Sequence, residues 1–342
     1  MPTLDQCEQR KDINHLVHEF GDEKELYKVL KEKYILPFHK LELNGYPIQE
    51  ASKGEREQAY LFPDQHERFV STYRDVRCCL NCKKSFSITE YSTEPPENNC
   101  QFHWGKKPKK PITCNLLRRN HKKLVIYKSP YETQYFCCGQ PYNSEGCTTR
   151  QYHVHQQITQ NDLNCHFKST EAVRPYDRTA RRVYALDCEM IFTTLGSEVV
   201  KVVLLDRNGT VLIDTFVQPR GRVIDLNTRT SGITEEDLMD VDMTFDEMRA
   251  KLFEHIKQDT ILIGQSLEFD FRALKMIHMN VVDTSMLFQL TEKDAKYSLK
   301  SLARDLLNLK IQRNGHNPVE DAMTTLRLVY QKIELDQRKE FY

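Results

Sequence analysis

Five residues in the second half of the sequence have the types and spacing needed to cleave a phosphate ester. Asp187 and Glu189 stand two residues apart in an apolar stretch, so on a strand both side chains would project from one face. Asp270 follows an apolar run at 260–264, and His316 precedes Asp321 by five residues. Neighbouring carboxylates resist burial unless a cation lies between them. Carboxylates that hold two divalent cations about 3.5–4 Å apart, with an imidazole of pKa about 6.5 to take a proton from water, suit two-metal hydrolysis of a phosphodiester.

Each of these residues also has an ordinary structural explanation. An Asp-x-Glu pair at a strand end is common, and Asp270 is acceptable as a solvated helix residue. Asp321 would complement the positive end of a helix, and His316 would suit a turn beside glycine. The order of all five along the chain is what favours catalysis. Asp283, an acid after a short strand, is explained at least as well by orienting the backbone of Thr284, and we leave it out of the catalytic set.

Cysteines and histidines in the first half are spaced like zinc ligands. Nine of the eleven cysteines lie between Cys78 and Cys165, in a chain where metal or free thiols are more plausible than disulfides. Tetrahedral zinc takes four ligands, so eight make two closed structural sites. The eight candidates are Cys79, Cys82, Cys100, His103, Cys137, Cys138, Cys147 and His153. Their division between the sites is open, and Cys78, Cys114 and His155 compete for ligand roles.

A basic stretch interrupts the cysteine-rich region. Residues 101–130 contain nine Lys or Arg and no Asp or Glu, with Phe102, Trp104 and Tyr127 among them. Phosphate attraction and base stacking together hold single-stranded nucleic acid, although a solvated insertion loop would have the same composition. We expect RNA contacts from Lys106, Lys107, Lys109 and Lys110. The same lysines look like a nuclear import signal, so we expect the nucleus, with the cytoplasm as the alternative.

Apolar periodicity places the candidate catalytic residues on alternating strands and helices. Residues 183–190 and 199–206 are β-branched runs typical of strands, and Asn208-Gly209 before 211–217 indicates a hairpin. A capping box from Thr244 to Glu247 starts a helix that runs to 255. The other expected elements are strands at 260–264 and 281–283 and helices at 266–277, 298–309 and 318–334. An α/β fold with a mixed β-sheet flanked by helices follows.

The length of the chain and its distribution of charge suggest two domains. It has 342 residues with 49 basic and 49 acidic side chains, and about 100–200 residues per domain suggest two domains. Residues 181–342 carry 22 basic and 26 acidic groups, a net of −4, which leaves +4 for residues 1–180. We expect a helical segment at 1–40, a zinc-binding domain with its basic loop at 41–167, a linker at 168–181 and the α/β domain at 182–337.

The N-terminal region carries no sign of chemistry. No run approaches the roughly 18 apolar residues of a membrane span, and the first residues lack the apolar core of a signal peptide. A soluble, intracellular protein without a membrane partner is expected. Residues 22–33 form a mixed-charge helix with Leu26, Val29 and Leu30 on one face, which we expect to dock on the zinc domain or on a protein partner.

The second half resembles the DEDDh exonucleases, and within them the GOR/RNA-exonuclease-one family. The resemblance covers nearly all of residues 182–335. It is carried by the segments ALDCEM, DTFVQP, NTRTSGITEEDL, DTILIGQSLEFDFRALKMIH, VVDTS, SLKSLA and GHNPVEDA. The cysteine–histidine pattern and Asn44-Gly45-Tyr46-Pro47 resemble the zinc-binding segment found upstream of the nuclease in the same family, and more distantly a CHORD-type domain.

The resemblance implies a ribonuclease H-like exonuclease fold with an N-terminal zinc-binding domain. The family removes nucleotides from single-stranded RNA 3′ ends and releases 5′-monophosphates. Its motifs make Asp187, Glu189, Asp270 and Asp321 the ligands of two Mg²⁺ or Mn²⁺ ions, and His316 the general base. Met190 and Ile191 would pack against the terminal nucleotide. Gln265 stands where the family has the histidine of Gly-His-Ser, so we expect it to alter the fit of the substrate.

Two other interpretations stay open. A catalytically silent RNA-binding scaffold would keep the fold without the chemistry, although the five catalytic residues are all present. An exonuclease that acts on DNA is the second, because DEDDh sites cleave both nucleic acids.

Overall fold

The computed structural model describes residues 22–49, 58–92, 99–105, 134–141, 143–172, 181–289, 296–313 and 315–340. These residues form two compact units. Tyr73–Gln156 make the small unit, and the described parts of Met1–Thr72 and Gln157–Tyr342 make the large unit. The small unit is narrower than the cysteine-rich domain expected at 41–167, because the residues on both sides of it pair with strands of the large unit. β9 (Lys168–Ser169), for example, runs parallel to β15 (Met276–Ile277), although its residues were expected to begin a linker.

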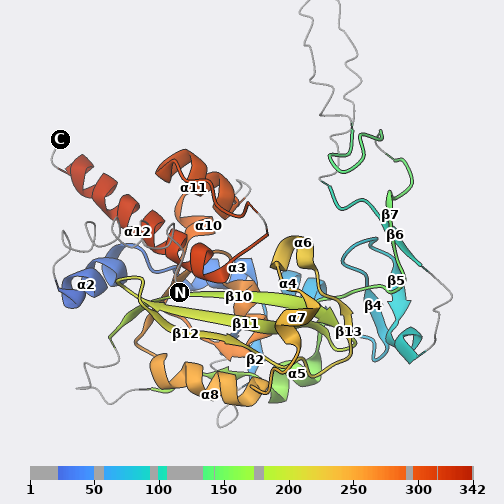
Figure 1. The fold of residues 1–342 in the computed structure, drawn as a ribbon. Coiled ribbons are helices and arrows are strands. Elements are labelled where there is room, and N and C mark those ends of the chain that lie inside the picture. The colour runs from blue at the N-terminus through green and yellow to red at the C-terminus, as the bar shows by residue number, and fades with distance from the viewer. Residues whose placement is uncertain are drawn as a thin grey trace, which may run out of the picture. The chain divides into compact units, whose positions relative to one another are not determined.

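The large unit is built on one mixed sheet (Figure 1). Its strands are β10 (Val183–Thr193), β11 (Gly196–Asp206), β12 (Val211–Phe216), β13 (Val223–Asp225), β14 (Ile261–Gly264) and β16 (Val281–Asp283). The order is β12-β11-β10-β14-β16, and β13 pairs with β10. β10, β11 and β12 are antiparallel neighbours, whereas β14 runs parallel to β10 and to β16. The expected hairpin is confirmed, and Asp206 Oδ1 accepts hydrogen bonds from the backbone N–H groups of Asn208 and Thr210.

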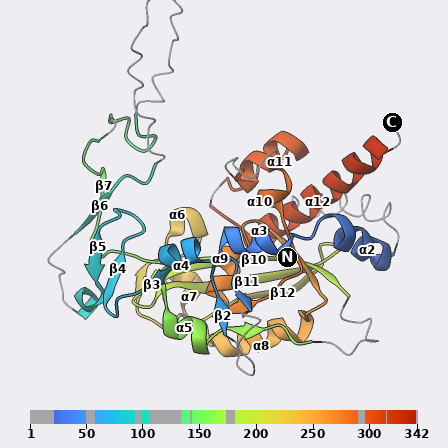
Figure 2. The same cartoon turned by 180° about the vertical axis from the view of Figure 1, so that it is seen from behind.

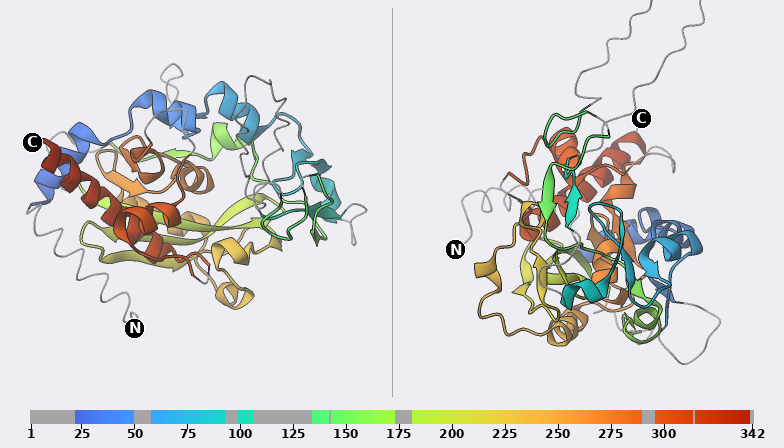
Figure 3. Two further views of the ribbon diagram at one scale, coloured as in Figure 1. Left: turned by 90° about the horizontal axis from the view of Figure 1, so that it is seen from above. Right: turned by 90° about the vertical axis from the view of Figure 1, so that its right-hand side faces the viewer.

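Helices cover both faces of this sheet (Figures 1 and 3). Alternate residues of β10 point to opposite faces. Ala185 lies in the apolar cluster with Leu326 of α12 (Pro318–Glu340), whereas Leu186 lies in the cluster with Leu252 of α8 (Phe245–His255). α8 begins at the expected capping box between Thr244 and Glu247. The other helices of this region are α6 (Thr228–Ser231), α7 (Glu235–Leu238), α9 (Glu268–Ala273), α10 (Thr284–Leu287) and α11 (Leu299–Leu307).

The helix expected at 266–277 is shorter in the structure. α9 ends at Ala273, and Lys275 has a positive φ of 52°, which a continuing α-helix excludes. Met276 and Ile277 then form β15, because β9 offers them a parallel partner. The last helix, by contrast, extends beyond 334 to Glu340.

The N-terminal helix packs within the large unit. α2 (Glu23–Lys33) buries Leu26 and Leu30 completely, in the same cluster as Ala185 and α12, and it is followed by α3 (Phe38–Asn44). Seen from behind, α2 lies beside α12 (Figure 2), where Tyr34 Oη donates to Asp336 Oδ2 at 3.0 Å. The expectation that this helix docks on the zinc domain or on a partner was therefore wrong, since its apolar face is used in the core of its own chain.

Short elements complete both units. The large unit also contains β1 (Ile48–Gln49), β2 (Ala59–Tyr60), α4 (Pro63–Phe69), β3 (Val70–Ser71), β8 (Ile158–Thr159) and α5 (Gln160–Cys165). The small unit contains β4 (Val76–Cys78), β5 (Ser85–Ser87), the 3-10 turn Ile88–Ser92, β6 (Cys100–Phe102) and β7 (Thr148–Arg150). β4 pairs with β5 and β6 with β7, both antiparallel. Within the described ranges, no helix has the length and apolar character of a membrane span.

Candidate active site and cysteine–histidine clusters

Four carboxyl groups converge around the central strand β10. Asp187 and Glu189 follow Val183 and Ala185 on β10, at alternate positions on the face that α12 covers. Asp270 lies on α9, just after the C-terminal end of β14, which runs parallel to β10. Asp321 lies in the first turn of α12. The middle of β10 and the first turns of α9 and α12 thus bring together the acids expected from the sequence.

Burial raises the pKa of all four carboxyl groups. Burial raises the pKa of Asp187 well above its ordinary value, and the charges of Asp321, Asp270 and Glu189 raise it further. Burial, with the charges of Asp321 and Asp270, raises the pKa of Glu189 to about 9. Burial also raises the pKa of Asp270 to about 8 and that of Asp321 to about 7. Carboxyl groups that repel one another in this way hold protons near neutral pH when no cation is bound.

His316 reaches the same site from a loop. Its Nδ1 lies 3.4 Å from Asp321 Oδ2, and Glu189, His316 and Asp321 each place one ligand atom within 4.8 Å of the others. The loop is tied down, because the His316 N–H donates to Thr230 O at 3.1 Å and a Cβ at Gly232 would lie 2.7 Å from His316 O. Burial, helped by the charge of Lys300, lowers the pKa of His316, so the imidazole is neutral at physiological pH and able to accept a proton.

The oxygen atoms of this site fit a hard divalent cation. Glu189 and Asp321 are 5% and 2% exposed, and among the described residues their Oε1 and Oδ1 atoms are buried without a hydrogen-bond partner. Buried anionic oxygens are stable only when they are paired or bind a metal. An all-carboxylate set of this kind is what Mg²⁺ or Mn²⁺ prefers.

Gln312 belongs to the site and was missed by sequence reasoning. Its Nε2 donates to Asp321 Oδ2 at 2.9 Å, the oxygen that also faces His316. Gln312 lies in an irregular stretch and has a positive φ of 54°. No periodicity or motif marks such a position, so nothing in the sequence would have identified it.

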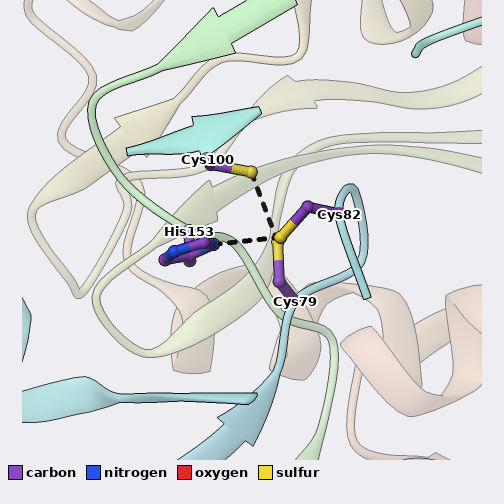
Figure 4. A group of neighbouring side chains, drawn as sticks. All are labelled: Cys79, Cys82, Cys100 and His153. Carbon is purple, nitrogen blue, oxygen red and sulfur yellow. Dashed lines mark hydrogen bonds between the residues drawn. The ribbon is translucent and has the colours of Figure 1, made fainter. Parts of the chain in front are cut away.

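The eight expected zinc ligands form two separate clusters in the small unit. The first contains Cys79, Cys82, Cys100 and His153 (Figure 4). Cys79 Sγ lies 3.6 Å from Cys100 Sγ, and Cys82 Sγ lies 3.3 Å from His153 Nδ1. The hydrogen bond between Cys79 and Cys100 lowers the pKa of Cys79 to about 4 and raises that of Cys100, while burial raises the pKa of Cys82. Without a metal the cluster therefore holds its thiolate on Cys79.

The second cluster contains His103, Cys137, Cys138 and Cys147. His103 Nδ1 is 3.5 Å from the Sγ atoms of both Cys137 and Cys138, and Cys147 Sγ is 3.5 Å from Cys137 Sγ. Both clusters have the size and the soft ligands of a tetrahedral zinc site, so each could bind zinc. The structure thereby assigns four of the candidate ligands to each cluster, an assignment that the sequence spacing alone left open.

The β6–β7 pair links the two clusters. Cys100 on β6 belongs to the first cluster, while His103 directly after β6 and Cys147 directly before β7 belong to the second. Gly146 keeps the strands close, because a Cβ there would lie 2.3 Å from Phe102 N. The competing candidates lie outside both clusters: Cys78 is exposed, and His155 is buried. Cys114 lies outside the described residues.

The expected substrate contacts stay predictions. Ile191 is completely buried with Val200 and Ile233, and Met190 is half-buried against the core, so packing already accounts for both. Gln265 accepts from Thr284 Oγ1 at 2.6 Å and donates to Tyr297 O at 2.8 Å, so the protein itself satisfies its side chain. Lys106, Lys107, Lys109 and Lys110 lie outside the described residues, and the nuclear location that they suggested stays a prediction with them.

Comparisons with known proteins give one family match and several similar chains. The RNase_T family, described as an exonuclease family, matches residues 185–329. Human "RNA exonuclease 1 homolog" is 36% identical over 316 residues, 92% of this chain and 24% of that protein. Human "Putative exonuclease GOR" is 33% identical over 311 residues, 90% of this chain and 43% of that protein. The chain therefore spans less than half the length of these relatives. Among solved structures, the Pan2 catalytic unit of Neurospora crassa matches 60% of this chain and 39% of its own with a TM-score of 0.45 and 22% identity.

Proposed function

We propose that residues 185–329, which match the RNase_T exonuclease family, are a phosphodiester hydrolase. In this proposal the chain removes nucleotides from the 3′ end of single-stranded RNA. The products would be 5′-monophosphates. One observation supports this most strongly: four carboxyl groups and a neutral imidazole converge where a phosphodiester could be hydrolysed. RNA as the substrate draws support from the relatives, of which several are called RNA exonucleases.

The carboxylates and the histidine have different roles in the proposed reaction. Asp187, Glu189, Asp270 and Asp321 would hold two Mg²⁺ or Mn²⁺ ions, which, when bound, activate water and stabilise the charge on the leaving 3′ oxygen. His316 would take the proton from the attacking water. A proton on Nδ1 would face Asp321 Oδ2, 3.4 Å away, and Nε2 would then keep the lone pair that accepts the proton from water. Asp321 faces the imidazole, and Gln312 holds the Asp321 oxygen in place.

The small unit would be stabilised by two zinc ions. Each strand described in this unit has three residues, and such short strands bury too little apolar surface to be stable alone. Two tetrahedral zinc sites would supply the missing free energy of folding, since metal binding to a small domain is coupled to its folding.

The experiment that tests this function compares matched RNA and DNA. Full-length protein is incubated with Mg²⁺ or Mn²⁺ and a 5′-labelled single-stranded oligonucleotide of either kind, and the released nucleotides are identified. We expect a ladder that shortens from the 3′ end of RNA and 5′-mononucleotide products. Faster shortening of the DNA would contradict the choice of substrate. Tight RNA binding without any shortening would replace the enzyme with an RNA-binding scaffold.

A further inference from the structure

Asp283 is the centre of a buried hydrogen-bond network beside the active site. It lies at the end of β16, is 1% exposed and stands opposite Gly264 of β14 in the parallel register. Its carboxylate accepts five hydrogen bonds. The donors are the Ser266 N–H at 2.9 Å, the Leu267 N–H at 3.1 Å, the Ser285 N–H at 2.8 Å, Ser285 Oγ at 2.6 Å and Tyr46 Oη at 2.5 Å.

Two of these bonds hold the turn that starts α9. Ser266 has a positive φ of 57°, which is rare for a residue with a side chain, and Asp283 binds the N–H groups of Ser266 and Leu267. The turn is packed tightly, because a Cβ at Gly264 would lie 2.5 Å from the Leu267 side chain. α9 has only six residues, so the position of Asp270 depends directly on the position of this turn.

Tyr46 comes from far upstream of the RNase_T match. It follows the C-cap of α3, Gly45, and its side chain is fully buried in the core of the large unit. Besides donating to Asp283, its ring packs edge-on against Phe271, with the centroids 5.5 Å apart. Gly45 O accepts a hydrogen bond from Arg272 Nη1 at 2.6 Å. Residues 45 and 46 therefore contact α9 directly at Phe271 and Arg272, the two residues after Asp270. Tyr46 is joined to the turn before Asp270 through the Asp283 carboxylate.

We propose that Tyr46 and Asp283 are positioning residues that fix Asp270 for metal binding, so that the segment upstream of the RNase_T match completes the catalytic site. The proposal rests on the exonuclease site described above. It predicts that loss of one buried hydroxyl, with the four carboxylates intact, weakens the binding of the divalent cation. Substitutions beside metal ligands commonly reduce metal affinity about 10–100-fold. Because Tyr46 acts through Asp283 and the turn, we expect about a tenfold loss.

Titration calorimetry with Mn²⁺ on the full zinc-loaded chain is the test, accompanied by thermal unfolding. Tyr46→Phe removes only the hydroxyl that donates to Asp283. Tyr27→Phe is the matched control, because Tyr27 is also buried in the upstream segment and donates to Asp259 O at 2.7 Å, a contact that does not involve α9. We expect Mn²⁺ affinity to fall about tenfold in Tyr46→Phe and to stay unchanged in Tyr27→Phe. Equal affinity in Tyr46→Phe and the wild type, or an equal loss in both variants, would overturn the proposal.

A second variant covers the case in which Tyr46→Phe does not fold. Ser285→Ala removes another side-chain donor to Asp283 and should weaken Mn²⁺ binding in the same direction, whereas wild-type affinity in Ser285→Ala would overturn the proposal. In RNA cleavage, the half-saturating Mn²⁺ concentration should shift while kcat recovers at saturating Mn²⁺. The calorimetry does not depend on cleavage, so wild-type protein that binds Mn²⁺ without degrading RNA would contradict the proposed function and leave the positioning role to be decided by the binding data.

Discussion

Nδ1 of His316 lies 3.4 Å from Oδ2 of Asp321, and Gln312 donates to that same oxygen. The pair joins the loop at 315–317 to the first turn of α12, so the proposed base lies against one of the proposed metal ligands. Asp321 Oδ1 is left free of hydrogen bonds within the described chain, and this oxygen is available to a cation.

His316→Ala should slow cleavage without removing the metals. A positioned general base contributes roughly 10²–10⁴-fold to a rate, so the single-turnover rate should fall by about that factor while Mn²⁺ and RNA affinities stay near those of the wild type. His255→Ala on α8, on the opposite face of the sheet, is the control and should cleave normally. Unchanged turnover in His316→Ala would remove this residue from the mechanism.

Gln312→Ala should have a smaller effect with a different signature. It leaves the imidazole in place but removes a donor to Asp321 Oδ2. Asp321 would then be less well oriented, so we expect weaker Mn²⁺ binding. At saturating Mn²⁺, the cleavage rate of Gln312→Ala should be closer to the wild-type rate than the rate of His316→Ala is. Mn²⁺-dependent rates over a range of concentrations separate the two variants. A drop in the saturated rate as large as that of His316→Ala would contradict this assignment.

Metal binding should depend strongly on pH. The pKa values of Glu189, Asp270 and Asp321 are raised to about 9, 8 and 7 in the folded, metal-free protein, above the roughly 4 of an unfolded chain. A raised carboxyl pKa means that the folded state binds more protons, so stability falls as the pH rises from about 4 through these values. Added Mg²⁺ neutralises the same carboxylates. We therefore expect the rise in Tm that Mg²⁺ causes to be small at pH 6 and to grow toward pH 9.

Glu189→Gln checks the origin of that pH dependence. The substitution removes a buried carboxylate, so the Mg²⁺-free variant should lose less stability than the wild type between pH 6 and 9, and Mg²⁺ should raise its Tm less. Glu254→Gln, an exposed position on α8, should behave as the wild type does. Identical pH profiles for Glu189→Gln and the wild type would show that these carboxyl groups do not cause the effect.

Neighbouring cysteines should differ in their effect on zinc content. Cys79 is buried in the first cluster, whereas the adjacent Cys78 is exposed and lies outside it. Cys79→Ser should lower the zinc content from two ions per chain to one and destabilise the small unit, because structural zinc supplies folding free energy. Cys78→Ser should keep both ions. Elemental analysis by mass spectrometry measures the ratio, and loss of zinc from Cys78→Ser would contradict the division of ligands.

The N-terminal helix should stabilise the exonuclease domain. Leu26 is fully buried with Leu30 against β10, β14 and α12. Leu26→Ala should reduce the free energy of unfolding by about 2–5 kcal/mol, as large-to-small core substitutions do, whereas Lys28→Ala at an exposed position should change it little. Urea denaturation measures both variants, and equal midpoints would mean that α2 is not part of the core.

Local signals predicted much of the fold. The β-branched runs, the Asn-Gly turn and the capping box at Thr244 depend on neighbouring residues, and each appears in the structure where it was expected. The convergence of the five catalytic candidates followed from their order on strands and helices. Alternation along β10 also explains why Cys188, which lies between the two acids, points into the core.

The sequence-based predictions that were wrong depend on contacts between segments that are distant in the chain. The helix expected to reach 277 stops at Ala273 because Met276 and Ile277 pair with residues about 108 positions earlier in the chain. The sequence correctly predicted an apolar face on α2, but no sequence rule says which surface such a face packs against. Asp283 looked like a local strand-end residue, whereas its carboxylate joins Tyr46, Ser266 and Ser285.

The most direct test of the central claim is the single-turnover cleavage of a 5′-labelled single-stranded RNA by Asp187→Asn in Mn²⁺. Asp242→Asn, an exposed acid in the loop before α8, serves as the control. We predict that the wild type and Asp242→Asn produce a ladder that shortens from the 3′ end, and that Asp187→Asn produces none while it unfolds at the wild-type temperature or above. Cleavage by Asp187→Asn at the wild-type rate would contradict the account.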